Sequence, residues 1–149
     1  MQRGPAPVLV LAVGNPSRGD DAVGPLLAER LVAAGLPGVE VLLDFQLQVE
    51  HALDLELRER VVFVDACVDA EAPVVVRRVV ADGRYAHTSH ALAPAQVLET
   101  YRRVTGREPP PAWLLGIRAE QFALGEALSP AATQGCEAAW PRLVELCSG

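Results

Sequence analysis

Residues 8–31, VLVLAVGNPSRGDDAVGPLLAERL, constrain the fold more than any other part of the chain. The unbroken apolar run Val8–Val13 is typical of a strand that is covered on both faces. Residues 14–21 contain Asn-Pro and Arg-Gly breakers and are predicted to form a loop. Residues 22–34 then show apolar positions at helical spacing, and Gly35 ends the pattern. A strand, a loop and a helix in this order predict an open α/β sheet, in which such a loop lies at the carboxyl edge where ligands usually bind.

The rest of the chain continues to alternate between strand and helix patterns. Further strands are predicted at 39–43, 61–64, 73–80 and 113–117, and further helices at 48–58, 94–104 and from Pro130 onward. Fewer than a dozen residues join the third strand to the fourth. That link is too short for a helical crossover, so the fourth strand is predicted to run antiparallel to the third. The pattern predicts a single domain over residues 1–149, a three-layer α/β/α fold with a five-stranded, mainly parallel twisted sheet containing one antiparallel strand.

Charge and composition exclude several classes of function. The net charge is −6, all 13 basic residues are arginine, and acids and arginines are interspersed. This balance argues against nucleic acid or an anionic membrane as the main partner. The absence of lysine excludes Schiff-base chemistry and a P-loop. No apolar run approaches the length of a membrane-spanning helix, and the first residues lack a signal-peptide pattern, so a cytoplasmic protein without membrane insertion is expected.

The three cysteines do not predict a disulfide framework or a zinc site. Their number is odd and they form no CxxC motif. Cys136 and Cys147 fall on the apolar face of the last predicted helix, where packing is the expected role. Cys67 lies two residues after a candidate site residue, Asp65, but the sequence fixes no general base beside it, so a nucleophilic role is not assigned.

Three residues are candidates for one site. Asp21 follows the first strand and Asp65 ends the third, so both are expected at the same carboxyl edge of the sheet. His90 comes after the antiparallel strand and just before a helix. Two carboxylates and an imidazole suit a borderline divalent metal such as nickel or zinc. Three protein ligands would leave coordination positions open for a substrate group.

Each candidate also has a purely structural interpretation. Asp20 or Asp21 could simply favour the N-terminal end of the following helix through its dipole. Asp65 could close a turn by accepting backbone hydrogen bonds. His87 and His90 are three residues apart and could lie on opposite sides of a loop. The residues alone leave these alternatives open.

Four segments together resemble the hydrogenase maturation protease family. AVGNPSRGDDAVG is similar to the family pattern G-[IV]-G-N-x4-D-[DE]-x2-G, with Ala12 in place of the first glycine. VVFVDA and HTSHALAPAQVL follow in the family's order, and LLGIRAEQFALGEALSP resembles its G-I-x-P-x4-G-x2-L-S-P pattern. These segments span nearly the whole chain and are specific in combination.

The resemblance implies an endopeptidase that removes the C-terminal extension of a [NiFe]-hydrogenase large-subunit precursor after nickel insertion. The family's metal-sensing triad falls on Asp21, Asp65 and His90, which would be both the catalytic and the metal-contacting residues. The Ni²⁺ would belong to the substrate, and the resting enzyme, expected to be a monomer, would be free of metal. The peptide-bond hydrolase would be of an aspartic or metal-dependent type. The docked metal could polarise the scissile carbonyl or activate a water while a carboxylate takes a proton, and the sequence leaves this choice open.

The chain departs from the family after the second strand. Many members have D-G-G-T there, whereas this chain has Asp44 followed by FQLQVE, which resembles a subgroup with Q-L-x-x-E. The substrate preference and the roles of Asp44 and His87 are therefore left open. Gly125 and the pair Ser129-Pro130 match the family, although capping of the last helix also explains the serine and the proline.

Two other functions compete with this interpretation. A nucleotide-binding domain is disfavoured because GNPSRGDDAVG lacks GxGxxG spacing and because paired acids would repel a pyrophosphate. A non-catalytic nickel-binding chaperone or docking module for hydrogenase assembly would use the same three residues, and only a cleavage assay separates it from a protease.

Overall fold

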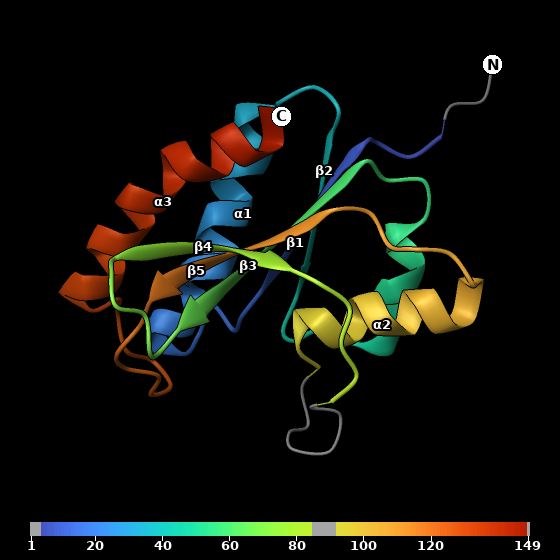
Figure 1. Ribbon diagram of the computed structural model, residues 1–149. Helices are drawn as coiled ribbons and strands as arrows, with labels where there is room; N and C mark the ends of the chain where they lie inside the picture. The colour runs from blue at the N-terminus through green and yellow to red at the C-terminus, as the bar shows by residue number, and fades with distance from the viewer. Residues whose placement is uncertain (1–3, 85–91, 149) are drawn as a thin grey trace.

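The computed structural model describes residues 4–84 and 92–148, and its strands form a five-stranded sheet in the order β2-β1-β3-β5-β4 (Figure 1). The strands are β1 (Val8–Val13), β2 (Val39–Asp44), β3 (Arg60–Cys67), β4 (Val74–Val79) and β5 (Ala112–Arg118). Neighbours β2-β1, β1-β3 and β3-β5 are parallel, and β4 pairs antiparallel with β5. The predicted mainly parallel sheet with an antiparallel strand is confirmed.

Helices cover both faces of this sheet (Figure 1). They are α1 (Val23–Ala34), α2 (Pro94–Thr105), α3 (Pro130–Ser148) and the 3₁₀ helices η1 (Gly19–Ala22) and η2 (Val49–Leu55). Helices α1 and α3 pack on one face, whereas α2 and η2 pack on the other. The result is the predicted three-layer α/β/α arrangement. Within the described ranges, no helix is both long and apolar enough to span a membrane.

The alternation of side chains along the central strands divides the core into two halves. All six residues of β1 are buried. Its even-numbered residues pack with α1 and α3, and its odd-numbered residues pack with η2 and α2. In β3, Val62 and Val64 belong to the first half, and Val61 and Phe63 to the second. These strands are continuous apolar runs because both of their faces are covered.

Three predicted elements differ in detail. The predicted helix 48–58 is the shorter 3₁₀ helix η2, a geometry that is usual in short connecting segments. The third strand does not end at Asp65 but continues to Cys67, because Asp65, Ala66 and Cys67 pair with β5. The fourth strand runs antiparallel to the third as predicted, but β5 lies between them.

The beginning of α3 follows its local sequence signal. The Ser129 hydroxyl oxygen accepts a hydrogen bond from the Ala132 N–H at 3.1 Å, and Pro130 occupies the first helical position. This contact satisfies one of the amide groups that an α-helix leaves free at its N-terminal end. The predicted cap is confirmed.

Candidate active site

Asp21 and Asp65 lie at the same end of the sheet. Asp21 belongs to η1, directly after the β1 turn, and Asp65 lies near the end of β3, the neighbour of β1. The charge of Asp21 acts on the carboxyl group of Asp65. Because side chains alternate along a strand, Asp65 projects on the same face as Phe63, toward the layer of η2 and α2. The two acids lie close enough for their charges to interact, at the edge that their positions after the strands predict. Their catalytic and metal-contacting roles stay predictions.

Burial strongly raises the pKa of Asp65. Loss of solvent raises the pKa of its carboxyl group from 3.8 to about 7. The Ala66 N–H donates a hydrogen bond to Oδ1 at 2.7 Å and lowers the pKa, but it does not offset burial, and the charge of Asp21 raises the pKa further. Asp65 is therefore present in both protonation states near neutral pH, as suits a group that exchanges a proton during binding or catalysis.

The turn after β1 holds Asp21. The Asn15 N–H donates a hydrogen bond to Oδ2 of Asp21 at 2.6 Å. Gly14 has a φ of 147°, and a Cβ atom at this position would lie 2.0 Å from the Asp21 carbonyl oxygen. Only glycine fits so close to the η1 backbone. The Gly-Asn pair of the turn therefore fixes the candidate carboxylate, and it does not have the spacing of a phosphate-binding loop.

Asp20 lies in the first turn of η1, as its structural interpretation implies, but it also has contacts that the sequence does not predict. Its exposed fraction is 0%, and its carboxylate accepts four hydrogen bonds. The N–H groups of Glu120 and Gln121 donate at 2.7 and 3.2 Å, and Ser129 donates both its N–H and its hydroxyl at 2.7 Å. Burial alone would raise the pKa of Asp20, but these bonds outweigh it and lower the pKa below its ordinary value.

This carboxylate joins two loops that are far apart in sequence. It fixes η1 to the segment 119–129, and the backbone N–H of Asp20 also donates to the Gln121 carbonyl at 2.7 Å. Gly19 belongs to the same contact, because a Cβ atom there would lie 2.6 Å from that carbonyl oxygen. Ser129 was predicted only as a helix cap, and the structure adds its role as a donor to Asp20. The family pattern, which contains both segments, was the available signal for this contact.

His51 was not identified from the sequence. Its exposed fraction is 9%, and its Nδ1 accepts a hydrogen bond from the Gln48 N–H at 2.8 Å. In the neutral ring Nε2 therefore carries the proton, and it lies 3.4 Å from Oδ2 of Asp44. The Phe45 N–H donates to Oδ1 of Asp44 at 2.7 Å. The sequence of 48–58 predicts a helix from its apolar residues, and no local pattern marks this histidine as a site residue.

Asp44 belongs to the same end of the sheet. It is the last residue of β2 and pairs with Val13, the last residue of β1. Its side chain faces η2, as its contact with His51 requires, which is the face on which Asp65 projects. Asp44 is therefore a third carboxylate near the candidate site, with its orientation fixed by His51 and the Phe45 N–H.

The histidine of the predicted triad lies outside the described residues. His87 and His90 both belong to 85–91, so their positions relative to Asp21 and Asp65 stay predictions. The chain on either side of this segment is held together, since the Asp82 N–H donates to the Ala95 carbonyl at 3.1 Å. Helix α2, which contains Ala95, packs against η2. Among residues 4–84 and 92–148, no three His, Cys, Asp or Glu side chains gather closely enough to hold a metal.

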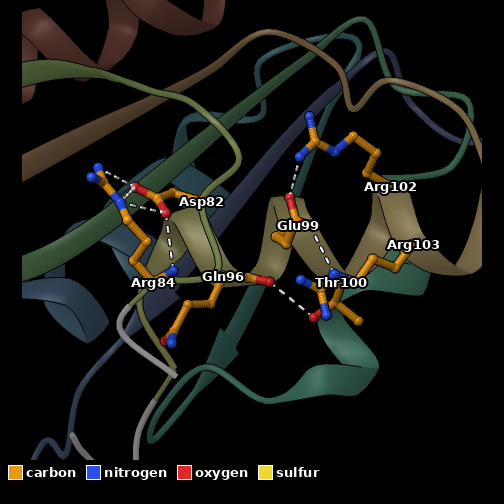
Figure 2. A network of polar contacts seen from close by, with 7 residues as sticks. All are labelled: Asp82, Arg84, Gln96, Glu99, Thr100, Arg102 and Arg103. Carbon is orange, nitrogen blue, oxygen red and sulfur yellow. Dashed lines mark hydrogen bonds and ion pairs between the residues drawn. The ribbon is translucent and has the colours of Figure 1, made fainter. Parts of the chain in front are cut away.

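Figure 2 shows polar contacts that flank this segment. The Arg84 guanidinium pairs with Asp82, with 2.8 Å between Nη2 and Oδ2. On α2, Glu99 pairs with Arg102 at 2.6 Å and with Arg103 at 2.8 Å. Ion pairs made by solvent-exposed arginines contribute little stability individually. On α2 these pairs hold the side chains of Glu99, Arg102 and Arg103 against one another.

Cys67 is not suited to be a nucleophile. Burial raises the pKa of its thiol, and the hydrogen bond from its Sγ to Oδ1 of Asp69, at 3.1 Å, raises it further. A thiol needs a lowered pKa to react as a thiolate at neutral pH. The candidate chemistry therefore rests on carboxylates and not on sulfur.

Several solved structures that match this fold are hydrogenase maturation enzymes, although no protein-family model and no curated protein sequence matches the chain. The hydrogenase maturating endopeptidase HybD from E. coli aligns over 93% of this chain and 90% of its own, with a TM-score of 0.70 and 26% identity. The [NiFe] hydrogenase maturation protease HycI from Thermococcus kodakarensis KOD1 aligns over 98% and 95%, with a TM-score of 0.71 and 25% identity. An endopeptidase from Escherichia coli, solved in solution, aligns over 93% of this chain and 90% of its own, with a TM-score of 0.72 and 26% identity. The shared fold extends over almost the full length of each chain and accompanies the four sequence segments, so this chain is similar in fold and in sequence pattern to hydrogenase maturation proteases.

Proposed function

We propose that this protein is an endopeptidase that removes the C-terminal extension of a [NiFe]-hydrogenase large-subunit precursor after nickel insertion. The observation that carries the proposal is Asp65, a carboxyl group with a pKa of about 7 beside Asp21. It lies at the carboxyl edge of the sheet, in a fold shared with the endopeptidase HybD from E. coli.

The two carboxylates explain how loading with nickel could be recognised. Ionising both groups in a half-buried site is unfavourable because their charges repel each other. A divalent cation between them would remove the repulsion and displace the proton from Asp65. A precursor that presents nickel would therefore bind better than one that lacks it. His90 would supply the third ligand, and the mixed oxygen and nitrogen set suits nickel. We propose that the resting protein has no nickel of its own.

Hydrolysis also needs a group that takes a proton from the attacking water as the peptide bond breaks. Asp65 could take this proton if it binds the nickel through only one of its two oxygens. Asp44 is a second candidate, because it projects on the same face of the sheet and His51 fixes its orientation. The proposed chemistry is thus proton transfer by a carboxylate next to a nickel ion that arrives with the substrate.

Cleavage of a nickel-loaded precursor tests this function. Wild-type protein should release the C-terminal extension, and a precursor without nickel should stay intact. Asp21→Ala, Asp65→Ala and His90→Ala should each lose at least about a hundredfold in rate while keeping the wild-type circular dichroism spectrum. Glu145→Ala, at an exposed position of α3, is the matched control and should cleave normally.

Two results would contradict the proposal. Normal cleavage by all three variants would mean that the site lies elsewhere. Binding of the nickel-loaded precursor by the wild type without any cleavage would favour the non-catalytic nickel-binding chaperone or docking module.

A further inference from the structure

A small pocket lies between the end of β2 and the turn after β1, the same turn that holds Asp21. Its volume is about 230 Å³, and it is lined by Gly14, Pro16, Leu43, Asp44 and Phe45. Pockets for small molecules usually have about 300–1,000 Å³. This pocket is therefore better suited to one large side chain than to a cofactor.

The rim of the pocket is apolar and open to solvent. Leu43 is 53% exposed and Phe45 is 68% exposed. Strand β2 is at the edge of the sheet, so no further strand covers these residues within the described chain. Exposed apolar side chains that gather around a concave surface are typical of a site where another molecule binds.

The charge in the lining of the pocket disfavours an anionic occupant. Gly14, Pro16, Leu43 and Phe45 carry no charge, so Asp44 is the only ionisable side chain in its lining. The carboxylate of Asp44 already accepts a hydrogen bond from the Phe45 N–H and lies 3.4 Å from Nε2 of His51. With these contacts in place, the remaining surface favours an apolar side chain.

The walls of the pocket are formed before any ligand binds. The Gly14 N–H donates to the Asp44 carbonyl at 3.1 Å, which joins the two walls. Nε2 of the buried His51 lies 3.4 Å from Oδ2 of Asp44 and restricts the movement of that side chain. A preformed pocket spends less binding free energy on ordering its own side chains.

The same turn connects the pocket to the candidate site. Gly14 lines the pocket, and the next residue, Asn15, donates its N–H to the Asp21 carboxylate at 2.6 Å. A chain segment bound at Asp21 would therefore pass within a few residues of the pocket. We propose that this pocket binds one apolar side chain of the precursor, located within a few residues of the bond that is cut. The inference rests on the proposed function and adds a determinant of substrate choice.

Binding and cleavage of the precursor are measured separately to test this pocket. Stopped-flow anisotropy of a labelled, nickel-loaded precursor reports binding before cleavage, and gel analysis of the same samples reports processing. Phe45→Ala and Leu43→Ala should each weaken binding by about tenfold without changing thermal unfolding, because both side chains are exposed. Val32→Ala removes a side chain that is also apolar and 64% exposed, but lies on α1, and it should bind like the wild type.

A second set of variants identifies the occupant. Each precursor residue near the cut is replaced by alanine and tested against wild type and Phe45→Ala. One apolar position should show a non-additive effect with Phe45, because the two side chains would touch. Unchanged binding by both pocket variants, additive effects at every position, or a wild type that does not bind the precursor would each overturn the inference. Binding that depends on Phe45 without cleavage would support the pocket and contradict only the proposed protease activity.

Discussion

Asp20 and Asp65 are acids in the same part of the fold with opposite environments. Asp20 is fully buried but accepts four hydrogen bonds, and its pKa lies below the ordinary value. Asp65 is less buried, receives a hydrogen bond from the Ala66 N–H and lies near the charge of Asp21, and its pKa rises to about 7. The donors around Asp20 are numerous enough to outweigh its loss of solvent, whereas the one donor to Asp65 is not.

This difference separates a structural acid from one that is available for chemistry. The oxygens of Asp20 are occupied by groups from two loops, so a ligand would have to break bonds to reach them. Asp65 keeps acceptor capacity and exchanges its proton near neutral pH. A carboxylate in this state is costly for the folded protein, and such groups are concentrated at functional sites.

The largest effect on stability is expected from Asp20→Ala. The change leaves the amide groups of Glu120, Gln121 and Ser129 without their acceptor in a buried place. The free energy of unfolding at pH 7 should fall by about 3–5 kcal/mol, as measured by urea denaturation followed by circular dichroism. Asp20→Asn should also be destabilised, because its amide group places a donor against other donors.

Asp21→Ala is the matched control for this experiment. Asp21 is the next residue and has the same side chain, but only one hydrogen bond, from the Asn15 N–H, is described for it. Its loss should cost no more than about 1.5 kcal/mol. Equal destabilisation by the two variants would show that Asp20 is not the anchor of the 119–129 segment.

The next largest effect on the free energy of unfolding is expected to be an increase. Asp65→Asn should stabilise the protein at pH 8 by roughly 2–4 kcal/mol and should abolish processing. The pKa of Asp65 is raised from 3.8 to about 7 in the fold, so the folded wild type binds more protons than the unfolded chain between these values. Wild-type stability therefore falls as the pH rises from about 4 to about 7, whereas the asparagine variant lacks this loss.

Urea denaturation of both proteins across this pH range measures the difference. The two unfolding free energies should converge below about pH 3, where the wild-type carboxyl group is protonated in both the folded and the unfolded state. A constant difference at every pH would mean that Asp65 is not the titrating group. The same measurement in the Asp21→Ala background tests the contribution of Asp21 to the raised pKa of Asp65. If the charge of Asp21 contributes, the loss of stability should end at a lower pH in that background.

Local signals in the sequence predict most of the fold. The apolar run of β1 indicates burial on both faces, and Gly35 and Gly106 end α1 and α2 in the left-handed conformation that glycine allows. Ser129 begins α3 as a cap. These features depend on residues close together in the chain. The position of β5 between β3 and β4 does not, because an apolar strand can pair with several neighbours.

The candidate site is less accessible to sequence reasoning for the same reason. Asp21 and Asp65 could be predicted together because parallel strands bring their carboxyl ends to one edge. Asp20 and Ser129 are 109 positions apart, and no local pattern distinguishes an anchoring acid from a helix-end acid. His51 shares its short helix with apolar residues, and only the fold places it beside Asp44. The role of His90 stays a prediction from the family pattern.

The smallest expected effect concerns the partner of Asp20. Ser129→Ala removes the helix cap and the hydroxyl donor but keeps the three amide donors of Asp20, so it should cost about 1–2 kcal/mol of unfolding free energy. Ser148→Ala, at the exposed end of the same helix, is the control and should stay within about 0.5 kcal/mol of wild type. In a double-mutant cycle, Ser129 should show coupling with Asp20 and none with Asp65, since only the first pair shares a hydrogen bond. Coupling of similar size in both pairs would remove the distinction between an anchoring carboxylate and an available one.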